Sequence, residues 1–156
     1  MTTLLEKTTL RAASDSDVAV LNALMRASKG HWEYDVDFLD SFMERYTLTP
    51  AYTQKALVVL MEEAGTVCGF YGFGLEDDAP TLDYFFIHPS FIGNGLGRLL
   101  WQDCVAKAKI KGWESFTFIS DPDAEPFYER MGAQKIGDWK SSLAEDRYCP
   151  IMEYTA

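Results

Sequence analysis

The sequence predicts a single α/β domain built around a mixed sheet, and three observations lead to this prediction. The chain has 156 residues, the size of one ordinary domain. Hydrophobic residues make up 47% of the chain, which is enough for a sizeable core. Hairpin strands come first along the chain and helix-linked strands come later, an order that indicates a mixed sheet. We therefore expect residues 1–156 to form one domain.

The elements expected in the first half follow from apolar periodicity and turn residues. Apolar residues at helical spacing predict two helices, and Asp15 or Ser16 is suited to cap the first. Two strand-like runs around Glu63-Ala64-Gly65 predict an antiparallel hairpin. In chain order we expect a strand at 8–13, a helix from Val18 to Ser28, a link at 29–37, a helix from Phe38 to Tyr46 ending before Pro50, and the hairpin at 56–76.

The second half of the sequence predicts strands that are joined by helices. The segment TLDYFFIHP is apolar on both faces near its end, which suits a central strand covered on both sides. Three lysines near the end of the following helix complement its dipole, and Gly112 ends it. In chain order we expect a loop at 76–80, a strand at 81–89, a helix from Leu96 to about Ala108, a strand at 115–120, a short helix within 121–132, and late strands at 133–139 and 150–155.

Charge and cysteine content narrow the functional classes. The formal net charge is −10, with 24 acidic against 14 basic residues, so a nucleic-acid backbone would be repelled. This acidity either keeps a cytosolic protein soluble or favours a cationic partner. The three cysteines form no metal-binding pattern and are expected to be small packing residues in a reducing compartment. No signal peptide or membrane-spanning run is apparent, so we expect a cytoplasmic protein without a metal or a membrane partner.

The strand at 81–89 is followed by three glycines at every second position, Gly93, Gly95 and Gly97, just before a helix. Without a Cβ, glycine exposes the backbone N–H groups and reaches dihedral angles that other residues avoid. Several N–H groups at a helix start can converge on one anion, so this segment is suited to hold phosphate. The alternative is a tight strand-to-helix turn that only allows close packing.

Two familiar phosphate-binding loops are excluded by the residues that follow. A P-loop needs Gly-Lys-Ser/Thr at the helix start, whereas Arg98-Leu99 follows Gly97 here. A dinucleotide fingerprint needs a third glycine at a position that holds Arg98 or Leu100, depending on where counting begins.

The segment instead resembles the acetyl-CoA loop of the GCN5-related N-acetyltransferases (GNAT). That family has a strand ending in Val/Ile-x-Pro, followed by Gln/Arg-x-x-Gly-x-Gly/Ala and a helix. Ile87-His88-Pro89 corresponds to the strand end, and Gly95 and Gly97 match the loop glycines. Ile92 departs from the usual Gln/Arg, which removes a side-chain contact but not the backbone amides.

A second block strengthens the resemblance. SDPDAEPFYERMGA is similar to the family segment Asn-x-x-Ala-x-x-Phe-Tyr-x-x-x-Gly-Phe/Ala. Ala124, Phe127, Tyr128 and Gly132 match it, while Asp121 replaces the usual Asn. The two blocks are separated by one helix and one strand, and the earlier order of elements also fits, so the resemblance covers nearly the whole chain.

This resemblance implies a GNAT fold, with a mixed, mostly antiparallel sheet of about six to seven strands flanked by about four helices. It also implies acetyl-CoA as cofactor and transfer of its acetyl group to an amine. The cofactor-binding residues that the resemblance implies are Phe86, Ile87, Ile92, Gly93, Asn94, Gly95, Leu96, Gly97, Arg98, Asp121, Ala124, Phe127 and Tyr128. A backbone N–H of Phe86 or Ile87 is expected to stabilise the developing oxyanion.

Two residues are candidates for proton transfer. The tyrosine that corresponds to Tyr128 lies near the CoA sulfur in the family, so Tyr128 is expected to be the general acid, because a phenol stays protonated at neutral pH. Asp83 is the only carboxylate of its strand and is either the base, directly or through water, or an anchor for substrate charge. Scattered cysteines and histidines give no Cys-His nucleophile, so direct transfer in a ternary complex is favoured.

The acceptor is expected to bind near the link between the first two helices. Trp32 and Tyr34 in this link, with the carboxylates of Glu33 and Asp35, suit a primary ammonium group, although ordinary packing of an aromatic loop is the alternative. Asp83 is also expected to contact the acceptor. A small-molecule amine is favoured over a protein N-terminus or lysine. A non-catalytic CoA-binding module also stays open, since Ile92 and Asp121 depart from the family pattern, and dimers common in the family suggest a homodimer.

Overall fold

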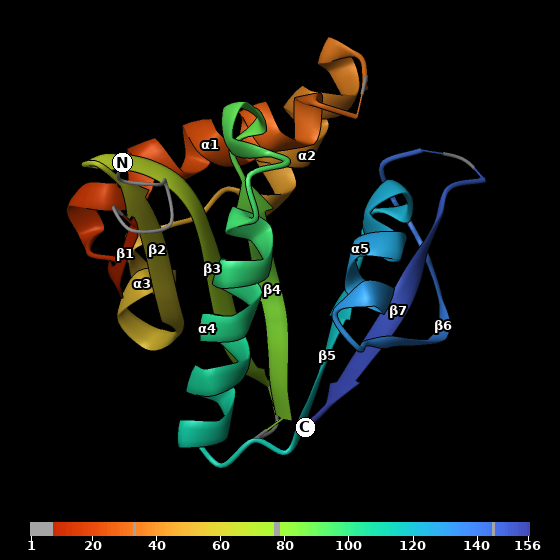
Figure 1. The fold of residues 1–156 in the computed structure, drawn as a ribbon. Coiled ribbons are helices and arrows are strands. Elements are labelled where there is room, and N and C mark those ends of the chain that lie inside the picture. The colour runs from red at the N-terminus through yellow and green to blue at the C-terminus, as the bar shows by residue number, and fades with distance from the viewer. Residues whose placement is uncertain (1–7, 33, 77–78, 145) are drawn as a thin grey trace.

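The computed structural model describes residues 8–32, 34–76, 79–144 and 146–156, and it has the expected mixed α/β architecture (Figure 1). A seven-stranded sheet runs in the order β1-β2-β3-β4-β5-β7-β6. All neighbouring strands are antiparallel except β4 and β5. The strands are β1 (Thr8–Ala12), β2 (Leu57–Glu63), β3 (Thr66–Glu76), β4 (Ala79–Ile87), β5 (Ser115–Ile119), β6 (Gln134–Lys140) and β7 (Tyr148–Thr155).

The described residues form five α-helices, and each face of the sheet has its own core. One core joins β-strand side chains to α4 and α5, and the other joins them to α1 and α2. The helices are α1 (Val18–Gly30), α2 (Val36–Tyr46), α3 (Pro50–Lys55), α4 (Leu96–Ile110) and α5 (Glu125–Arg130). None of the helices in the described ranges is long and apolar enough to span a membrane. The three cysteines are free and buried, as expected of packing residues.

Local sequence explains most element boundaries. In the β2–β3 hairpin, Ala64 and Gly65 both have positive φ, 49° and 86°, as a two-residue turn that matches the strand twist requires. The Asp35 side chain accepts a hydrogen bond of 2.8 Å from the Phe38 N–H and caps α2. Gly112, with φ of 82°, follows the end of α4.

Several boundaries differ from the sequence-based expectation. Pro50 lies beyond the end of α2, as expected, but it also begins α3, a helix that was not predicted. Thr49 caps this helix, and proline is favoured in the first turn. The expected loop at 76–80 is shorter, since Glu76 pairs with Ala79; residues 77 and 78 lie outside the described ranges. The first helix is entered through Ser14 and a 3₁₀ turn at Asp15–Asp17, rather than at a cap on Asp15 or Ser16. Strand β7 begins at Tyr148, two residues earlier than expected, and lies inside the sheet.

Candidate active site

The site begins where the two parallel strands separate. Within the described part of the chain, β4 and β5 are paired at only one position, Thr81 with Thr117. Beyond this pair the strands diverge, with α4 packed beside β4 and α5 beside β5 (Figure 1). The divergence leaves a slot between the two halves of the sheet.

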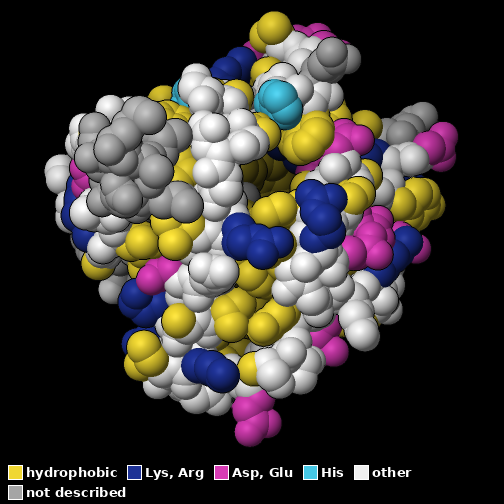
Figure 2. Space-filling model, viewed as in Figure 1, with side chains coloured by type: hydrophobic (Ala, Val, Ile, Leu, Met, Phe, Trp, Pro, Cys, Tyr) yellow, Lys and Arg dark blue, Asp and Glu magenta, His cyan; other side chains and the backbone are white. Residues whose placement is uncertain are grey.

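A cavity of about 880 Å³ fills this slot and reaches both faces of the sheet. Its lining comes from the loop before α4, the ends of β4 and β5, and α5, and also from α1, α2 and the segment between β6 and β7. Figure 2 shows a hollow on the α4–α5 face, with hydrophobic side chains inside and lysine or arginine side chains beside it. Arg98 and Arg130 are among the residues that line the cavity.

The glycine loop forms one wall at the start of α4. Gly93 and Gly95 have φ of 90° and 78°, values that a residue with a Cβ adopts only under strain. In the described ranges, the backbone N–H groups of residues 93–98 donate no hydrogen bond. Four of these residues, Gly93, Gly95, Gly97 and Arg98, line the cavity. N–H groups without a protein partner at the positive end of a 15-residue helix form a fitting cradle for a phosphate group.

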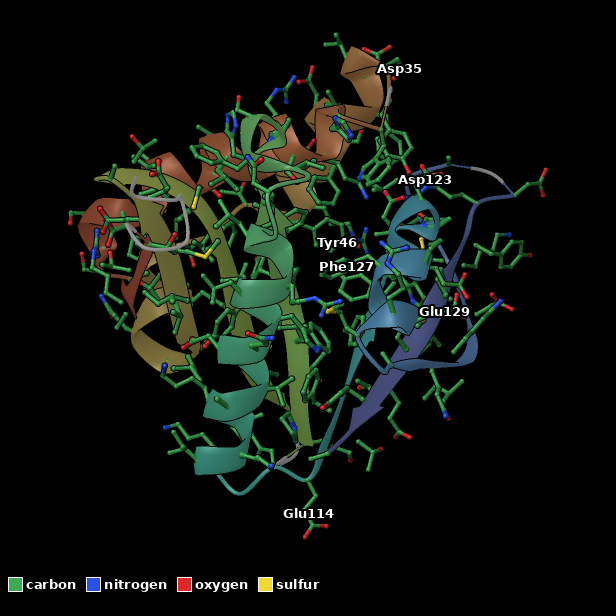
Figure 3. All side chains as sticks on the ribbon, viewed as in Figure 1. Asp35, Tyr46, Glu114, Asp123, Phe127 and Glu129 are labelled. Atoms are coloured by element: carbon green, nitrogen blue, oxygen red, sulfur yellow. The ribbon has the colours of Figure 1, made fainter. Side chains whose placement is uncertain are left out.

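Gly97 is needed for a different reason. A Cβ at this position would lie 3.3 Å from the ring of Phe127, which projects from α5 toward α4 (Figure 3). Glycine therefore lets the two helices approach each other at the slot. Of the predicted cofactor-binding residues, Leu96 is buried in the core and Asn94 does not line the cavity, so each contributes only its backbone at this wall.

The open edge of β4 presents backbone donors to the slot. The His88 N–H bonds the Cys68 carbonyl on β3 at 2.8 Å. Because N–H directions alternate along a strand, the Phe86 N–H also faces β3, whereas those of Phe85 and Ile87 face the diverging β5. Of the two donors considered from the sequence, only the Ile87 N–H is therefore directed into the slot.

Tyr128 lines the cavity from the α5 side and is only 8% exposed. Its ring contacts four aromatic rings with centroid distances of 4.7 to 5.9 Å, those of Phe118, Phe127, Trp101 and Phe85. Its hydroxyl makes no hydrogen bond within the described residues. Burial raises the pKa of Tyr128, so the hydroxyl keeps its proton at neutral pH.

Asp83 lines the same cavity at a β-bulge in β4, where the register with β3 shifts between Gly72 and Phe73. Its carboxylate accepts a hydrogen bond of 2.7 Å from the hydroxyl of Tyr52 on α3. A Cβ on Gly74 of the neighbouring strand would collide with this carboxylate. Asp83 is exposed, but its position is fixed by Tyr52 and by the space that Gly74 leaves.

A buried polar cluster borders the cavity where α1, the end of β5 and the segment between β6 and β7 meet. The Asp121 carboxylate accepts hydrogen bonds from Lys29 Nζ at 2.6 Å, from the Tyr34 hydroxyl at 2.8 Å and from Arg147 Nη2 at 3.4 Å. Burial raises the pKa of Asp121, but the charge and hydrogen bond of Lys29 outweigh it, and the net pKa is lowered. We call Lys29, Tyr34, Asp121 and Arg147 the Lys29–Arg147 cluster.

The predicted acceptor residues are thus divided between two roles. Trp32, at 37% exposure, lines the cavity as expected. Tyr34 instead stacks on Phe38, with ring centroids 4.1 Å apart, and donates to Asp121. Asp121, predicted to bind cofactor, does line the cavity, but one of its oxygens is occupied by this cluster.

Sequence reasoning missed Lys29 and Arg147. Lys29 had a usable signal, because it lies four residues after Met25 and therefore on the buried stripe of α1. A lysine on such a stripe needs a buried partner. Arg147 gave no such signal, since it comes from an irregular segment and its partners Tyr34 and Asp121 are distant in sequence.

The fold and the family of the chain are established by comparison with known proteins. The PaiA N-acetyltransferase of Thermoplasma acidophilum in complex with coenzyme A superposes with a TM-score of 0.80 at 16% identity, covering 96% of this chain and 99% of that one. Naa50 of Arabidopsis thaliana with a bisubstrate analogue superposes with a TM-score of 0.71 at 14% identity, covering 96% of this chain and 99% of that one. The ribosomal-protein-S18-alanine N-acetyltransferase of Escherichia coli superposes with a TM-score of 0.67 at 16% identity, covering 95% of this chain and 93% of that one.

These likenesses confirm the expected fold. The comparison with curated protein sequences gives no match. A family model described as an acetyltransferase (GNAT) domain matches residues 22–142, well over half of the chain. The match includes the glycine loop and the Phe127-Tyr128 segment on which the resemblance depended. The chain therefore belongs to the GNAT acetyltransferase family.

Proposed function

We propose that this acetyltransferase moves the acetyl group of acetyl-CoA directly to the primary amine of a small molecule, both being bound in the cavity between β4 and β5. The observation that carries this proposal is the continuity of that cavity. It joins a row of unsatisfied N–H groups at residues 93–98 to the Tyr128 hydroxyl and to the Asp83 carboxylate. Structural relatives that hold coenzyme A or a bisubstrate analogue support the same assignment.

The residues around the glycine loop fit the pyrophosphate of acetyl-CoA. The N–H groups from Gly93 to Arg98 offer donors without a competing partner, and the helix dipole adds positive potential. Arg98 and Arg130 line the same part of the cavity and add cationic side chains near a phosphate. Ile92, which is 47% exposed, leaves this binding to the backbone.

When bound, acetyl-CoA supplies the thioester that the amine attacks. The Ile87 N–H, directed into the slot, is suited to stabilise the negative charge that develops on the carbonyl oxygen. Tyr128 is suited to protonate the departing sulfur, because its hydroxyl holds its proton and has no competing bond in the described residues. These two groups lie on opposite sides of the slot, so a thioester between them would meet both.

Asp83 is assigned to attract and orient the ammonium form of the acceptor. An exposed carboxylate, with an ordinary pKa near 3.9, is a poor base for an ammonium group of pKa near 10. Its exposure therefore favours an anchoring role in which water carries the proton away. Tyr52 holds the carboxylate in place through its 2.7 Å hydrogen bond.

A small molecule is favoured as the acceptor because the acceptor end is a recess with aromatic walls. This part of the cavity is lined from the turn after α1, from α2 and from the β6–β7 segment by Trp32, Phe42, Tyr46 and Leu143. Such walls suit a compact amine with an apolar portion.

The proposal is tested by following CoA release with a panel of primary amines. Tyr128→Phe should lower kcat by about 10²-fold, the scale of a general acid, while the Kd for CoA stays unchanged. Tyr148→Phe, at an exposed tyrosine outside the cavity, is the matched control and should keep wild-type kcat. Tight CoA binding without release for any amine would instead indicate a non-catalytic module, and an unchanged kcat in Tyr128→Phe would remove the acid assignment.

A further inference from the structure

We infer that the acceptor carries a carboxylate as well as its amine, and that Lys29 and Arg147 bind this carboxylate. The inference rests on the proposed function and concerns charged groups of the cavity that the proposed transfer chemistry leaves unused. Lys29, Asp121 and Arg147 all line the cavity. The cluster holds two cations against one carboxylate, a local excess of one positive charge in a chain whose overall charge is −10.

The excess charge is largely removed from solvent. The side chains of Lys29, Asp121 and Arg147 are only 8%, 9% and 13% exposed. A buried cation without a full counter-charge is unfavourable, and an anion that enters the cavity would relieve this imbalance. Asp123 also lines the cavity, but it is exposed, so water screens its carboxylate.

Donors remain available for such an anion. Within the described residues, Arg147 donates to Cys149 Sγ, to the Tyr34 hydroxyl and to Asp121, which accounts for at most three of its five N–H groups. Lys29 uses one of its three N–H groups on Asp121. A carboxylate is the anion that the planar guanidinium matches best, because two N–H groups can meet its two oxygens.

Both cations are already held in position before a ligand arrives. Lys29 Nζ lies 4.9 Å from the ring centroid of Phe42 and 5.2 Å from that of Tyr34. The Arg147 guanidinium lies 5.1 Å from the ring of Phe38. Rings and hydrogen bonds together fix long side chains that would otherwise lose entropy on binding. With Asp83 lining the same cavity, the site offers a carboxylate to an ammonium group and two cations to a carboxylate.

The experiment compares acceptors that differ only in this group. CoA release is measured with two matched sets: phenylalanine, phenylalaninamide and phenethylamine, and 5-aminopentanoate, 5-aminopentanamide and pentylamine. In at least one set, kcat/KM should be about tenfold or more higher for the carboxylate than for its amide, the scale of a charge-assisted hydrogen bond. Binding of the same compounds to the CoA-saturated protein is measured by calorimetry, so that selectivity is read without turnover.

Substitutions identify the residues responsible. Arg147→Gln should bring the carboxylate-to-amide ratio of kcat/KM close to one, and Arg147→Lys should restore part of the preference. Lys140→Gln removes a charge at an exposed position of β6 outside the cavity and should keep the wild-type ratio. An equal loss for all three compounds in Arg147→Gln would mean that Arg147 only supports the structure, and the inference would be wrong.

The failures of the two proposals are distinguishable. Turnover of amides or plain amines as fast as carboxylates, with equal binding, would overturn the inference and leave the proposed function intact. Selective binding of the carboxylates without CoA release would overturn the proposed function and support the inference. Binding of none of the compounds would overturn the inference.

Discussion

Replacing Asp121 by asparagine isolates the charge of the Lys29–Arg147 cluster from the geometry that surrounds it. Asparagine keeps an oxygen to accept the 2.9 Å hydrogen bond from the Asp123 N–H, so the turn before α5 stays capped. It loses the carboxylate that Lys29 and Arg147 share. Two cations then remain in a largely buried site without a counter-charge.

The expected loss follows from this burial. Removing one partner of a buried ion pair costs about 3–5 kcal/mol. The cavity borders the cluster, so water can reach Lys29, and we expect the lower end, a decrease of about 3 kcal/mol in the free energy of unfolding. Adding Lys29→Met to Asp121→Asn should return part of this stability, because it removes an unpaired charge of similar length.

Urea denaturation followed by circular dichroism measures these differences. The control is Asp138→Asn, which breaks an ion pair with Lys135 whose side chains are 53% and 44% exposed, and it should cost about 1 kcal/mol or less. A loss below about 1 kcal/mol for Asp121→Asn, with an unchanged m value, would show that the buried charge is compensated elsewhere and would refute the reasoning.

Three further predictions concern the loop, the anchor and acid stability. Gly95→Ala forces a Cβ onto a residue with φ of 78° and should weaken CoA binding about tenfold, since the strain is of order 1–2 kcal/mol. The control Gly112→Ala imposes similar strain at the other end of α4, and equilibrium titration should show an unchanged affinity for CoA. Gly74→Ala should raise the KM for the amine without changing the Kd for CoA, because the added methyl group displaces the Asp83 carboxylate; equal effects on both ligands would contradict this. The hydrogen bond from Arg11 lowers the pKa of Asp17 to about 2, below its ordinary value of 3.8. The Asp17 carboxylate therefore stabilises the fold above about pH 4, and this contribution is lost as the pH falls toward 2. In denaturation at a series of pH values, the stability difference between wild type and Asp17→Asn should shrink over that range.

The parts of the site that could be predicted from sequence are those whose chemistry is local. The glycine loop was recognisable because positive φ at Gly93 and Gly95 and close contact at Gly97 require glycine itself. Helices were predicted where apolar residues repeat at helical spacing, as in α2. Helix α3 was not predicted, because proline fits both the first turn of a helix and the segment after one, and only the cap at Thr49 distinguishes them.

The parts that could not be predicted depend on contacts between distant segments. Lys29 and Asp121 are 92 positions apart, and their pairing depends on how α1 packs against the end of β5. The choice between the Phe86 and Ile87 N–H groups as the donor depends on which edge of β4 faces the diverging strand β5, and local sequence does not specify this. Asp83 was identified as a residue of interest, but its partner Tyr52 comes from a helix that was not predicted.

The single backbone pairing that the described residues form between β4 and β5 also bears on how the sheet can deform. Beyond the Thr81–Thr117 pair, the two halves of the sheet are joined mainly by aromatic packing. Phe85 and Trp101 contribute rings on one side, and Phe116, Phe118 and Tyr128 contribute rings on the other. Dispersion contacts have little directional preference, so rings can slide by fractions of an ångström where a hydrogen-bonded ladder would have to break. We therefore expect the slot between β4 and β5 to change width more readily than the spacing of the strands that are joined by continuous ladders.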